Sequence, residues 1–162
     1  ASSLLDRYSL NKQSNLASYR AALNFGDPAL VAPIVIARKH SGLMVPAPVQ
    51  HAMALALTDT EHVKDQREVY AARRTLLLEA LTDVGLDVDP DSAAGLYLWV
   101  ADPANPTDSW ALVDRLADLG ILAAPGDFYG TAAHGRVRVA LTATDERIQA
   151  AASRIREAWT AR

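Results

Sequence analysis

A serine, a lysine and an arginine stand close together near the start of the chain, in the stretch SLNKQSNLASYR, residues 9–20. Ser9 precedes Lys12 by three positions, and Arg20 follows Lys12 by eight. Hydroxyl, ammonium and guanidinium groups bind phosphate, and an amine can also condense with an aldehyde. These residue types therefore indicate a site for a molecule that carries both a phosphate and an aldehyde.

Pyridoxal phosphate carries both groups. It needs an amine to hold its aldehyde as a Schiff base, and cations and hydroxyls to hold its phosphate dianion. Lys12 could supply the amine, while the forked guanidinium of Arg20 and the hydroxyl of Ser9 could bind the phosphate. A lysine that substrate has displaced from the aldehyde becomes a neutral base beside the substrate α-carbon.

Two other interpretations of this stretch stay open at this point. The three side chains could simply be solvated surface groups. The stretch also matches the S-x-x-K pattern of penicillin-binding serine enzymes, in which Ser9 would be the nucleophile. That pattern requires S-D-N and K-T-G tripeptides, which the chain lacks, and a helix opening at the motif, whereas residues 11–15 are poor helix formers.

The elements that must position this stretch alternate between strands and helices. Strands are predicted at residues 4–10 and 21–25, and Asp27 and Pro28 are typical of a helix start. Further helices are predicted over residues 28–40, which Pro33 should kink or delay, over 49–57, and from about 60 to Gly85.

The second half of the chain reads as a compact α/β unit. Strands are expected at 95–100, 121–124 and 136–141, with residues 86–91 turn-like, and helices are expected at 107–119 and from Thr144 onward. Trp99, Trp110 and Trp159 should pack in its core. We place the domain boundary inside the long helix, which gives domains of residues 1–68 and 69–162.

Composition excludes several classes of function. The net charge of -3 and 22% charged residues give no attraction to nucleic acid or an anionic membrane. The absence of cysteine excludes thiolate catalysis and disulfides, and the four histidines lack metal-site spacing. No apolar run reaches the roughly 20 residues of a membrane span, and the first residues do not resemble a signal peptide, so we expect a cytoplasmic protein.

The stretch SLNKQSNLASYR resembles the lysine motif of fold-type I aminotransferases. The resemblance implies that Lys12 carries pyridoxal 5'-phosphate and that Ser9 and Arg20 bind the phosphate of this cofactor. One position departs from the motif, because Ser18 stands where the family usually has glycine. A left-handed backbone at Ser18 would be strained.

Three later stretches extend the resemblance. AGLYLWV is similar to the strand that opens the small domain of these enzymes, ILAAPGDFYG to an active-site loop, and VRVALT to the strand whose arginine grips the substrate α-carboxylate. Arg136 and Arg138 lie two residues apart on one face of that strand, so spacing alone cannot choose between them. The resemblance favours Arg138 as the substrate-binding residue.

More narrowly, these stretches resemble N-succinyldiaminopimelate aminotransferases of lysine biosynthesis. The implied fold is the C-terminal portion of the aminotransferase fold, the end of the large domain plus the small α/β domain. The implied enzyme is a homodimer that moves an amino group between an amino acid, glutamate or succinyl-diaminopimelate, and a 2-oxo acid. A missing N-terminal part would be needed for activity. The alternatives are an aminotransferase of another amino acid and a non-catalytic binding or regulatory module.

Overall fold

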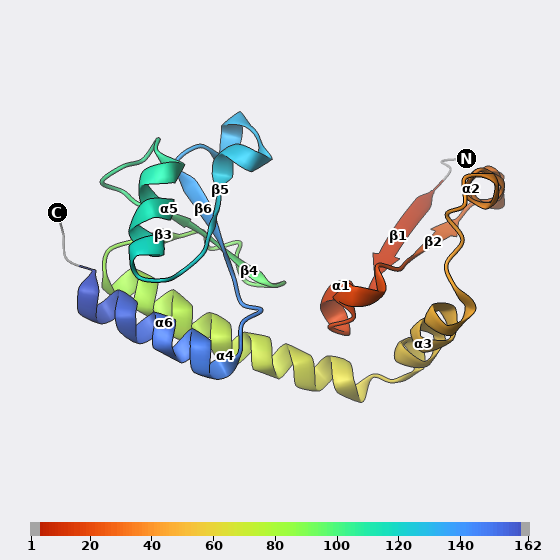
Figure 1. The fold of residues 1–162 in the computed structure, drawn as a ribbon, viewed down its shortest axis with the longest axis horizontal. Coiled ribbons are helices and arrows are strands. Elements are labelled where there is room, and N and C mark those ends of the chain that lie inside the picture. Colours follow the sequence, from red (N-terminus) through yellow and green to blue (C-terminus); the bar gives the residue numbers. More distant parts are fainter. Residues whose placement is uncertain (1–3, 160–162) are drawn as a thin grey trace. The chain divides into compact units, whose positions relative to one another are not determined.

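The computed structural model describes residues 4–159 (Figure 1). The chain divides into two compact units, Ala1–Arg67 and Glu68–Arg162. Within residues 4–159, none of the helices is both long enough and apolar enough to cross a membrane.

The first unit contains a two-stranded antiparallel sheet of β1 (Leu5–Ser9) and β2 (Ala22–Gly26), whose register pairs Ser9 with Ala22. Between the strands lie the short helix α1 (Leu10–Gln13) and the 3-10 turn η1 (Ala17–Tyr19). Helices α2 (Pro28–His40) and α3 (Ala47–Thr58) follow. Buried Leu10, Ala21 and Met53 form a small core, so α1 and the start of β2 are packed against α3.

Helix α2 starts at Pro28, as Asp27 and Pro28 predict, without the delay that Pro33 could have caused. The Asp27 carboxylate accepts the N–H of Ala29 at 2.9 Å, and Pro28 occupies the first helical position, where its missing N–H costs nothing. Pro33 lies within this helix, and its last turn is basic, with Arg38, Lys39 and His40. Cations near the C-terminus of a helix interact favourably with the helix dipole.

The second unit contains the C-terminal part of helix α4 (Glu61–Asp83) and a four-stranded antiparallel sheet. The strand order is β3 (Asp87–Val88), β4 (Tyr97–Ala101), β6 (Arg136–Ala140) and β5 (Ala124–Pro125). Strand β6 is therefore central in the unit. Arg138 pairs with Trp99 on one side and with Ala124 on the other, so its backbone is held by two neighbouring strands.

The two faces of this sheet differ in chemistry because side chains alternate along each strand. Leu98 and Val100 of β4, and Val137 and Val139 of β6, are buried in a core to which α4, α5 (Ser109–Asp118) and α6 (Asp145–Ala158) also contribute. Tyr97, Trp99, Arg136 and Arg138 occupy the opposite face and are only partly buried. The side chains on the polar face can therefore contact a ligand, while those on the apolar face form the core of the unit.

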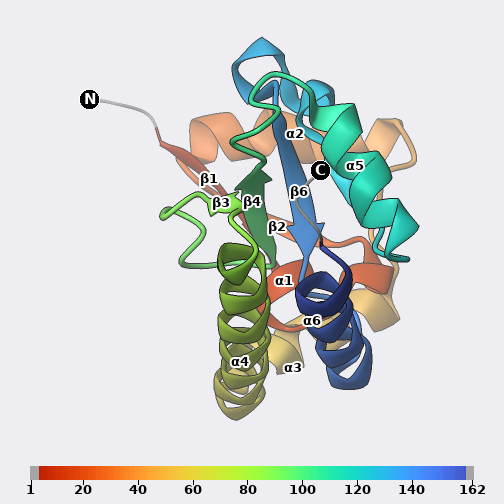
Figure 2. The same ribbon diagram turned by 90° about the vertical axis from the view of Figure 1, so that its left-hand side faces the viewer.

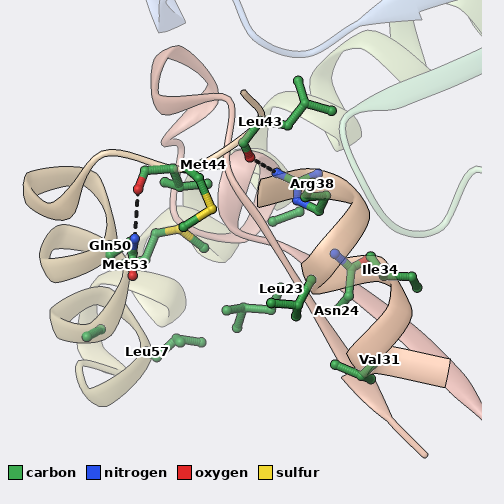
Figure 3. A pocket seen from close by; sticks show the side chains of 14 residues that line it. Leu23, Asn24, Val31, Ile34, Arg38, Leu43, Met44, Gln50, Met53 and Leu57 are labelled. Carbon is green, nitrogen blue, oxygen red and sulfur yellow. Dashed lines mark hydrogen bonds between the residues drawn. The ribbon is translucent and has the colours of Figure 1, made fainter. Parts of the chain in front are cut away.

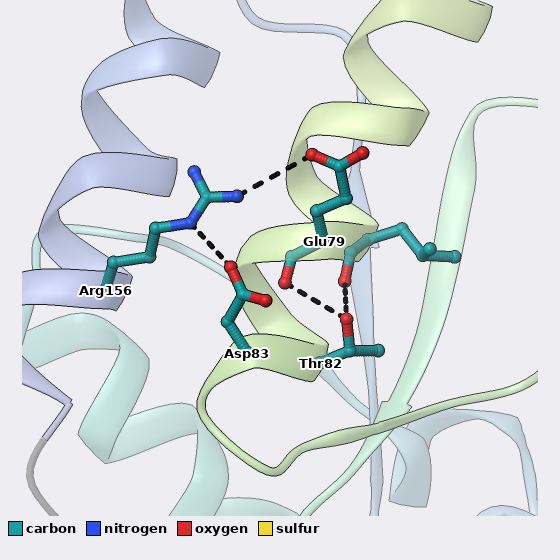
Figure 4. A network of polar contacts seen from close by, with 5 residues as sticks. Glu79, Thr82, Asp83 and Arg156 are labelled. Atoms are coloured by element: carbon teal, nitrogen blue, oxygen red, sulfur yellow. Dashed lines mark hydrogen bonds and ion pairs between the residues drawn. The ribbon is translucent and has the colours of Figure 1, made fainter.

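Helices α4 and α6 lie side by side in Figure 2 and are joined at their surface by the ion pairs of Figure 4. Arg156 lies 2.8 Å from Asp83 and 3.8 Å from Glu79, and the hydroxyl of Thr82 donates to the carbonyls of the preceding turn of α4. These charged side chains are exposed, so such pairs contribute only about 0 to 1 kcal/mol each. The apolar core beneath them, including Ile155, holds the helices.

Four sequence predictions of local structure are wrong. Residues 11–15 are poor helix formers, yet residues 11–13 lie in α1, because Ser9 caps this helix and offsets their poor propensity. The strand expected at 121–124 is reduced to Ala124–Pro125, because the N–H of Ile121 bonds to Leu116 and closes α5. The turn-like stretch 86–91 contains β3. Two of the three tryptophans lie outside the core: Trp110 is 47% exposed because α5 turns Leu112 and Leu116 toward the core instead. Trp99 lies on the sheet face opposite the buried Leu98 and Val100.

Candidate active site

Ser9 and Lys12 are positioned by the junction of β1 and α1. Ser9 is the last residue of β1 and caps α1, its hydroxyl oxygen accepting the N–H of Asn11 at 3.3 Å. This bond uses the oxygen of Ser9 as an acceptor and leaves its hydroxyl hydrogen free to donate. Lys12 follows three residues later and is exposed, and residues three apart are neighbours on a helix surface.

Arg20 ends the turn that follows α1. Its N–H bonds to the carbonyl of Ala17 at 3.3 Å, and its backbone is left-handed, with φ 51°. A left-handed backbone is uncommon for arginine and is retained only where the surrounding structure imposes it. The strain expected at Ser18 is therefore found two residues later, because Ser18 lies inside η1 and has no positive φ.

Two cations of this stretch have no carboxylate partner among the residues that the structure describes. Neither Lys12 nor Arg20 forms an ion pair with any residue of the described range 4–159. The side-chain oxygens of Asn11 and Ser14 are buried without a hydrogen-bond partner. The ammonium group of Lys12, the guanidinium of Arg20 and the hydroxyl of Ser9 are the donor types that a ligand with a phosphate dianion and an aldehyde requires.

Arg138 lies between aromatic rings on the polar face of the second unit. Its guanidinium carbon is 4.2 Å from the ring centre of Tyr97 and 5.0 Å from that of Tyr129. Tyr129 in turn meets Trp99 edge to face at 5.7 Å. In the part of the chain that the structure describes, Arg138 forms no ion pair.

Arg136 has a different environment from Arg138, although both project from the same face of β6. Its guanidinium lies 3.9 Å from Asp87 and 3.6 Å from Asp89. These two carboxylates come from β3 and the turn after it, the segment that the sequence analysis expected to be turn-like. The sequence therefore could not show that one of the two arginines is already paired.

The loop that carries Tyr129 is anchored at Asp127. The Asp127 carboxylate accepts the Ser109 hydroxyl at 3.2 Å and lies 3.1 Å from Nδ1 of His134. Gly126 packs so closely that an added Cβ would lie 1.9 Å from the carbonyl oxygen of Ala133. Sequence reasoning missed these anchors, because they join residues whose contact depends on how the loop folds back.

Sequence reasoning also missed Tyr97, although a signal was present. Tyr97 is two residues from Trp99, the register partner of Arg138, so it occupies the same face and lies diagonal to Arg138.

The first unit also contains an apolar pocket of about 390 Å³ between β2, α2 and α3 (Figure 3). Met44, Met53 and Leu57 are among its lining residues. Two of its polar side chains bond to backbone, Arg38 to the carbonyl of Leu43 at 2.8 Å and Gln50 to that of Val45 at 2.7 Å. No predicted site residue lines this pocket. Ser9, Lys12 and Arg20 belong to the first unit and Arg138 to the second.

The residues 4–155 match the family model of aminotransferase class I and II. The chain therefore belongs to the class I and II aminotransferase family. Aminotransferases of this class depend on pyridoxal phosphate, which agrees with the donor set at Ser9, Lys12 and Arg20. Family membership also excludes the penicillin-binding interpretation, even though Ser9 does open a helix.

Similar proteins agree with this assignment. The chain is 54% identical over 152 residues to the 4-dedimethylamino-4-oxo-anhydrotetracycline transaminase OxyQ of Streptomyces rimosus, covering 94% of this chain and 41% of that protein. It is 53% identical over 154 residues to the probable aminotransferase Rv1178 of Mycobacterium tuberculosis, covering 94% and 35%. An LL-diaminopimelate aminotransferase of Oleidesulfovibrio alaskensis is 32% identical over 148 residues, covering 91% and 38%.

Among solved structures, an aspartate aminotransferase of Thermus thermophilus, in a mutant form, matches with a TM-score of 0.82 and 27% identity, over 94% of this chain and 42% of that one. The fold is thus part of the aminotransferase fold, as the sequence predicts. The chain spans about two fifths of the length of the curated relatives that it matches.

Proposed function

We propose that this chain forms part of a pyridoxal-phosphate-dependent aminotransferase that moves an amino group between an amino acid and a 2-oxo acid. The observation that carries the proposal is that Lys12 and Arg20 form no ion pair among the described residues, in a chain of the class I and II family whose Ser9 hydroxyl can still donate. When bound, the cofactor supplies an electron sink for the substrate α-carbon.

The chain's own residues then have distinct tasks. Lys12, as the neutral amine, takes and returns the proton at the substrate α-carbon. The hydroxyl of Ser9 and the guanidinium of Arg20 hold the phosphate, and the left-handed backbone at Arg20 fixes the direction from which that side chain starts. Arg138 binds the substrate α-carboxylate through two parallel N–H···O bonds.

The environments of the two arginines support Arg138 over Arg136. A guanidinium that already faces Asp87 and Asp89 must give up those contacts to bind another carboxylate. Arg138 faces aromatic rings, which attract a cation without using its N–H donors as hydrogen bonds. Arg138 is therefore the better carboxylate ligand.

The proposal extends to organisation and partners. Residues 1–68 would be the end of the large cofactor-binding domain and residues 69–162 the small domain. The whole enzyme would be a cytoplasmic homodimer, and this chain would need the missing N-terminal part of the same enzyme for activity. Small-molecule amino acids and 2-oxo acids would be its substrates.

Two substrate classes are supported by different relatives. Diaminopimelate or its succinylated form, in lysine biosynthesis, is supported by the sequence resemblance and by the LL-diaminopimelate aminotransferase relative. A ring ketone is supported by the 54% identity to OxyQ, whose name specifies an oxo-anhydrotetracycline. Assays of the enzyme with succinyl-diaminopimelate, glutamate and a polycyclic ketone separate these classes.

The cofactor assignment is tested by borohydride reduction of the enzyme incubated with pyridoxal phosphate, followed by peptide mapping. The pyridoxyl group should be found on Lys12, and Lys12→Ala should abolish both the visible absorbance band and the labelling. Lys39→Ala and Lys64→Ala are matched controls that should keep both. A label on Lys39 or Lys64 with Lys12 unmodified would overturn the assignment. Absence of any label would favour a non-catalytic binding module.

A further inference from the structure

Arg138 is held by ring faces rather than by carboxylates. Tyr97 reaches it from the neighbouring strand β4, at a position diagonal to Arg138 in the antiparallel register. Tyr129 reaches it from the loop after β5. Both guanidinium-to-ring distances fall within the roughly 6 Å at which a cation is attracted to an aromatic face.

Each ring has structural contacts besides the one to Arg138. Tyr97 belongs to the paired strand β4 and Tyr129 packs edge to face against Trp99, with an interplanar angle of 75°. Tyr129 is two residues from Asp127, which is tied to Ser109 and His134. A long arginine side chain loses much rotamer entropy when a ligand immobilises it. Neighbours that already hold the side chain reduce the entropy lost on binding, because the guanidinium is preorganised.

We propose that Tyr97 and Tyr129 are positioning residues for Arg138, holding its guanidinium by the two rings and leaving its N–H edge available to a substrate carboxylate. The inference rests on the proposed function of Arg138. Carboxylates lie near the other arginine of this strand face, at 3.9 Å (Asp87) and 3.6 Å (Asp89) from Arg136, where they compensate its charge although its Nη1 has no hydrogen-bond partner among the described residues. The aromatic faces beside Arg138 leave its positive charge uncompensated.

The role belongs to the rings and not to the hydroxyl groups. Tyr97→Phe and Tyr129→Phe should therefore leave carboxylate affinity within about threefold, because a phenyl face attracts a cation in the same way. Tyr97→Leu and Tyr129→Leu should weaken carboxylate binding by about 3-fold to 30-fold, the equivalent of a cation–π contact of roughly 0.5 to 2 kcal/mol. KM should rise for amino donor and 2-oxo acceptor alike, with cofactor affinity unchanged.

The test has two readouts. In the complete enzyme, NMR of selectively labelled arginine side chains should show an Arg138 Nε–H resonance shifted upfield by the rings, retained in Tyr97→Phe and reduced in Tyr97→Leu, in which the Tyr129 ring remains. In the complete holoenzyme, the Kd of maleate, a dicarboxylate that cannot be transaminated, should follow the same order. Trp110→Leu removes an exposed aromatic that contacts Phe128 and should change neither readout.

Double variants separate the inference from the proposed function. In an Arg138→Ala background, Tyr97→Leu should cause no further loss of maleate affinity, because there is no guanidinium left to position. A full additional loss in that background, or equal losses in Tyr97→Phe and Tyr97→Leu, would overturn the positioning role alone. If Arg138→Ala itself leaves maleate affinity unchanged, the proposed function of Arg138 fails, and the inference fails with it.

Discussion

Arg136 and Arg138 project from the same face of β6, yet Arg136 lies within 4 Å of two carboxylates whereas Arg138 lies between two tyrosine rings. Alternation along a strand explains why the two side chains share a face. It does not explain their different partners, which come from β3, β4 and the loop after β5. Two chemically identical side chains thus acquire different surroundings from the elements beside them.

This difference predicts unequal effects of removing the two guanidinium groups. In the complete enzyme, Arg138→Ala should lower kcat/KM by about 30-fold to 1,000-fold, because a bidentate charge-assisted pair in a closed site contributes roughly 2 to 4 kcal/mol. Arg136→Ala should change kcat/KM little and reduce stability by less than about 1 kcal/mol. Steady-state kinetics of both variants decide the matter. The reverse ranking would show that Arg136 is the substrate ligand.

Contacts between residues close in sequence can be predicted from sequence, whereas contacts between distant residues require the fold. Ser9 and Lys12 share a short turn of chain, so their types and spacing indicate their chemistry directly. The pairing of Arg136 with Asp87 and Asp89 joins residues almost a third of the chain apart and needs the sheet order β3-β4-β6. The long helix and the strand at β6 were predictable from apolar periodicity, while α1 was not, because a single capping hydroxyl outweighs the propensity of the residues that follow.

Gly126 is expected to tolerate no side chain. An added Cβ would lie 1.9 Å from the Ala133 carbonyl oxygen and 2.7 Å from that of Arg136, and neither backbone group can move without opening the loop. Gly126→Ala should therefore destabilise the second unit by at least about 3 kcal/mol and displace Tyr129 from Arg138. Urea unfolding and the NMR signal of Arg138 measure the two effects.

Gly95 is the matched control for Gly126. Its φ of 73° makes an alanine strained there, at about 1 to 2 kcal/mol, but no atom lies within 4 Å of the added Cβ. Gly95→Ala should thus lower stability while leaving the Arg138 signal in place. An unchanged Arg138 signal in Gly126→Ala would show that this glycine does not set the position of the loop.

Asp102 is one of the few buried charged residues, with 5% of its surface exposed. It accepts the N–H of Ala104 at 2.9 Å and the amide of Asn105 at 3.2 Å, and it pairs with Arg115 at 3.2 Å. Asp102→Ala leaves these donors without this acceptor, so it should cost about 2 to 4 kcal/mol. Asp102→Asn, which keeps the shape and one acceptor, should cost about half as much.

The measurement for Asp102 is urea unfolding followed by tryptophan fluorescence, because all three tryptophans of the chain lie in the second unit. Asp114→Ala, at an exposed position of α5, is the control and should stay within about 0.5 kcal/mol of the parent. Equal stabilities of Asp102→Ala and Asp114→Ala would mean that the Asp102 network contributes nothing to the fold.

Asp59 should make the start of α4 sensitive to acid. Burial raises the pKa of its carboxyl group, but hydrogen bonds from the His62 side chain and from the backbone N–H groups of Glu61 and His62 outweigh that effect, so the pKa lies below its ordinary value. Asp59 accepts the N–H of Glu61 at 3.0 Å and lies 3.1 Å from Nδ1 of His62. Its contacts therefore stabilise the first turn of α4 while the carboxyl group is ionised.

A carboxyl group whose pKa is lower in the folded state than in the unfolded chain stabilises the fold while it is ionised. This stabilisation is fully present above the unfolded-state pKa and is lost as the pH falls through the folded-state pKa. The first turn of α4 should therefore fray as the pH is lowered below about 4. NMR chemical shifts of Glu61 and His62, followed from about pH 6 downward, measure this loss of helix. Asp59→Asn keeps an oxygen acceptor that does not ionise and should remove the acid transition at these two residues. If the transition persists unchanged in Asp59→Asn, another group controls the start of α4.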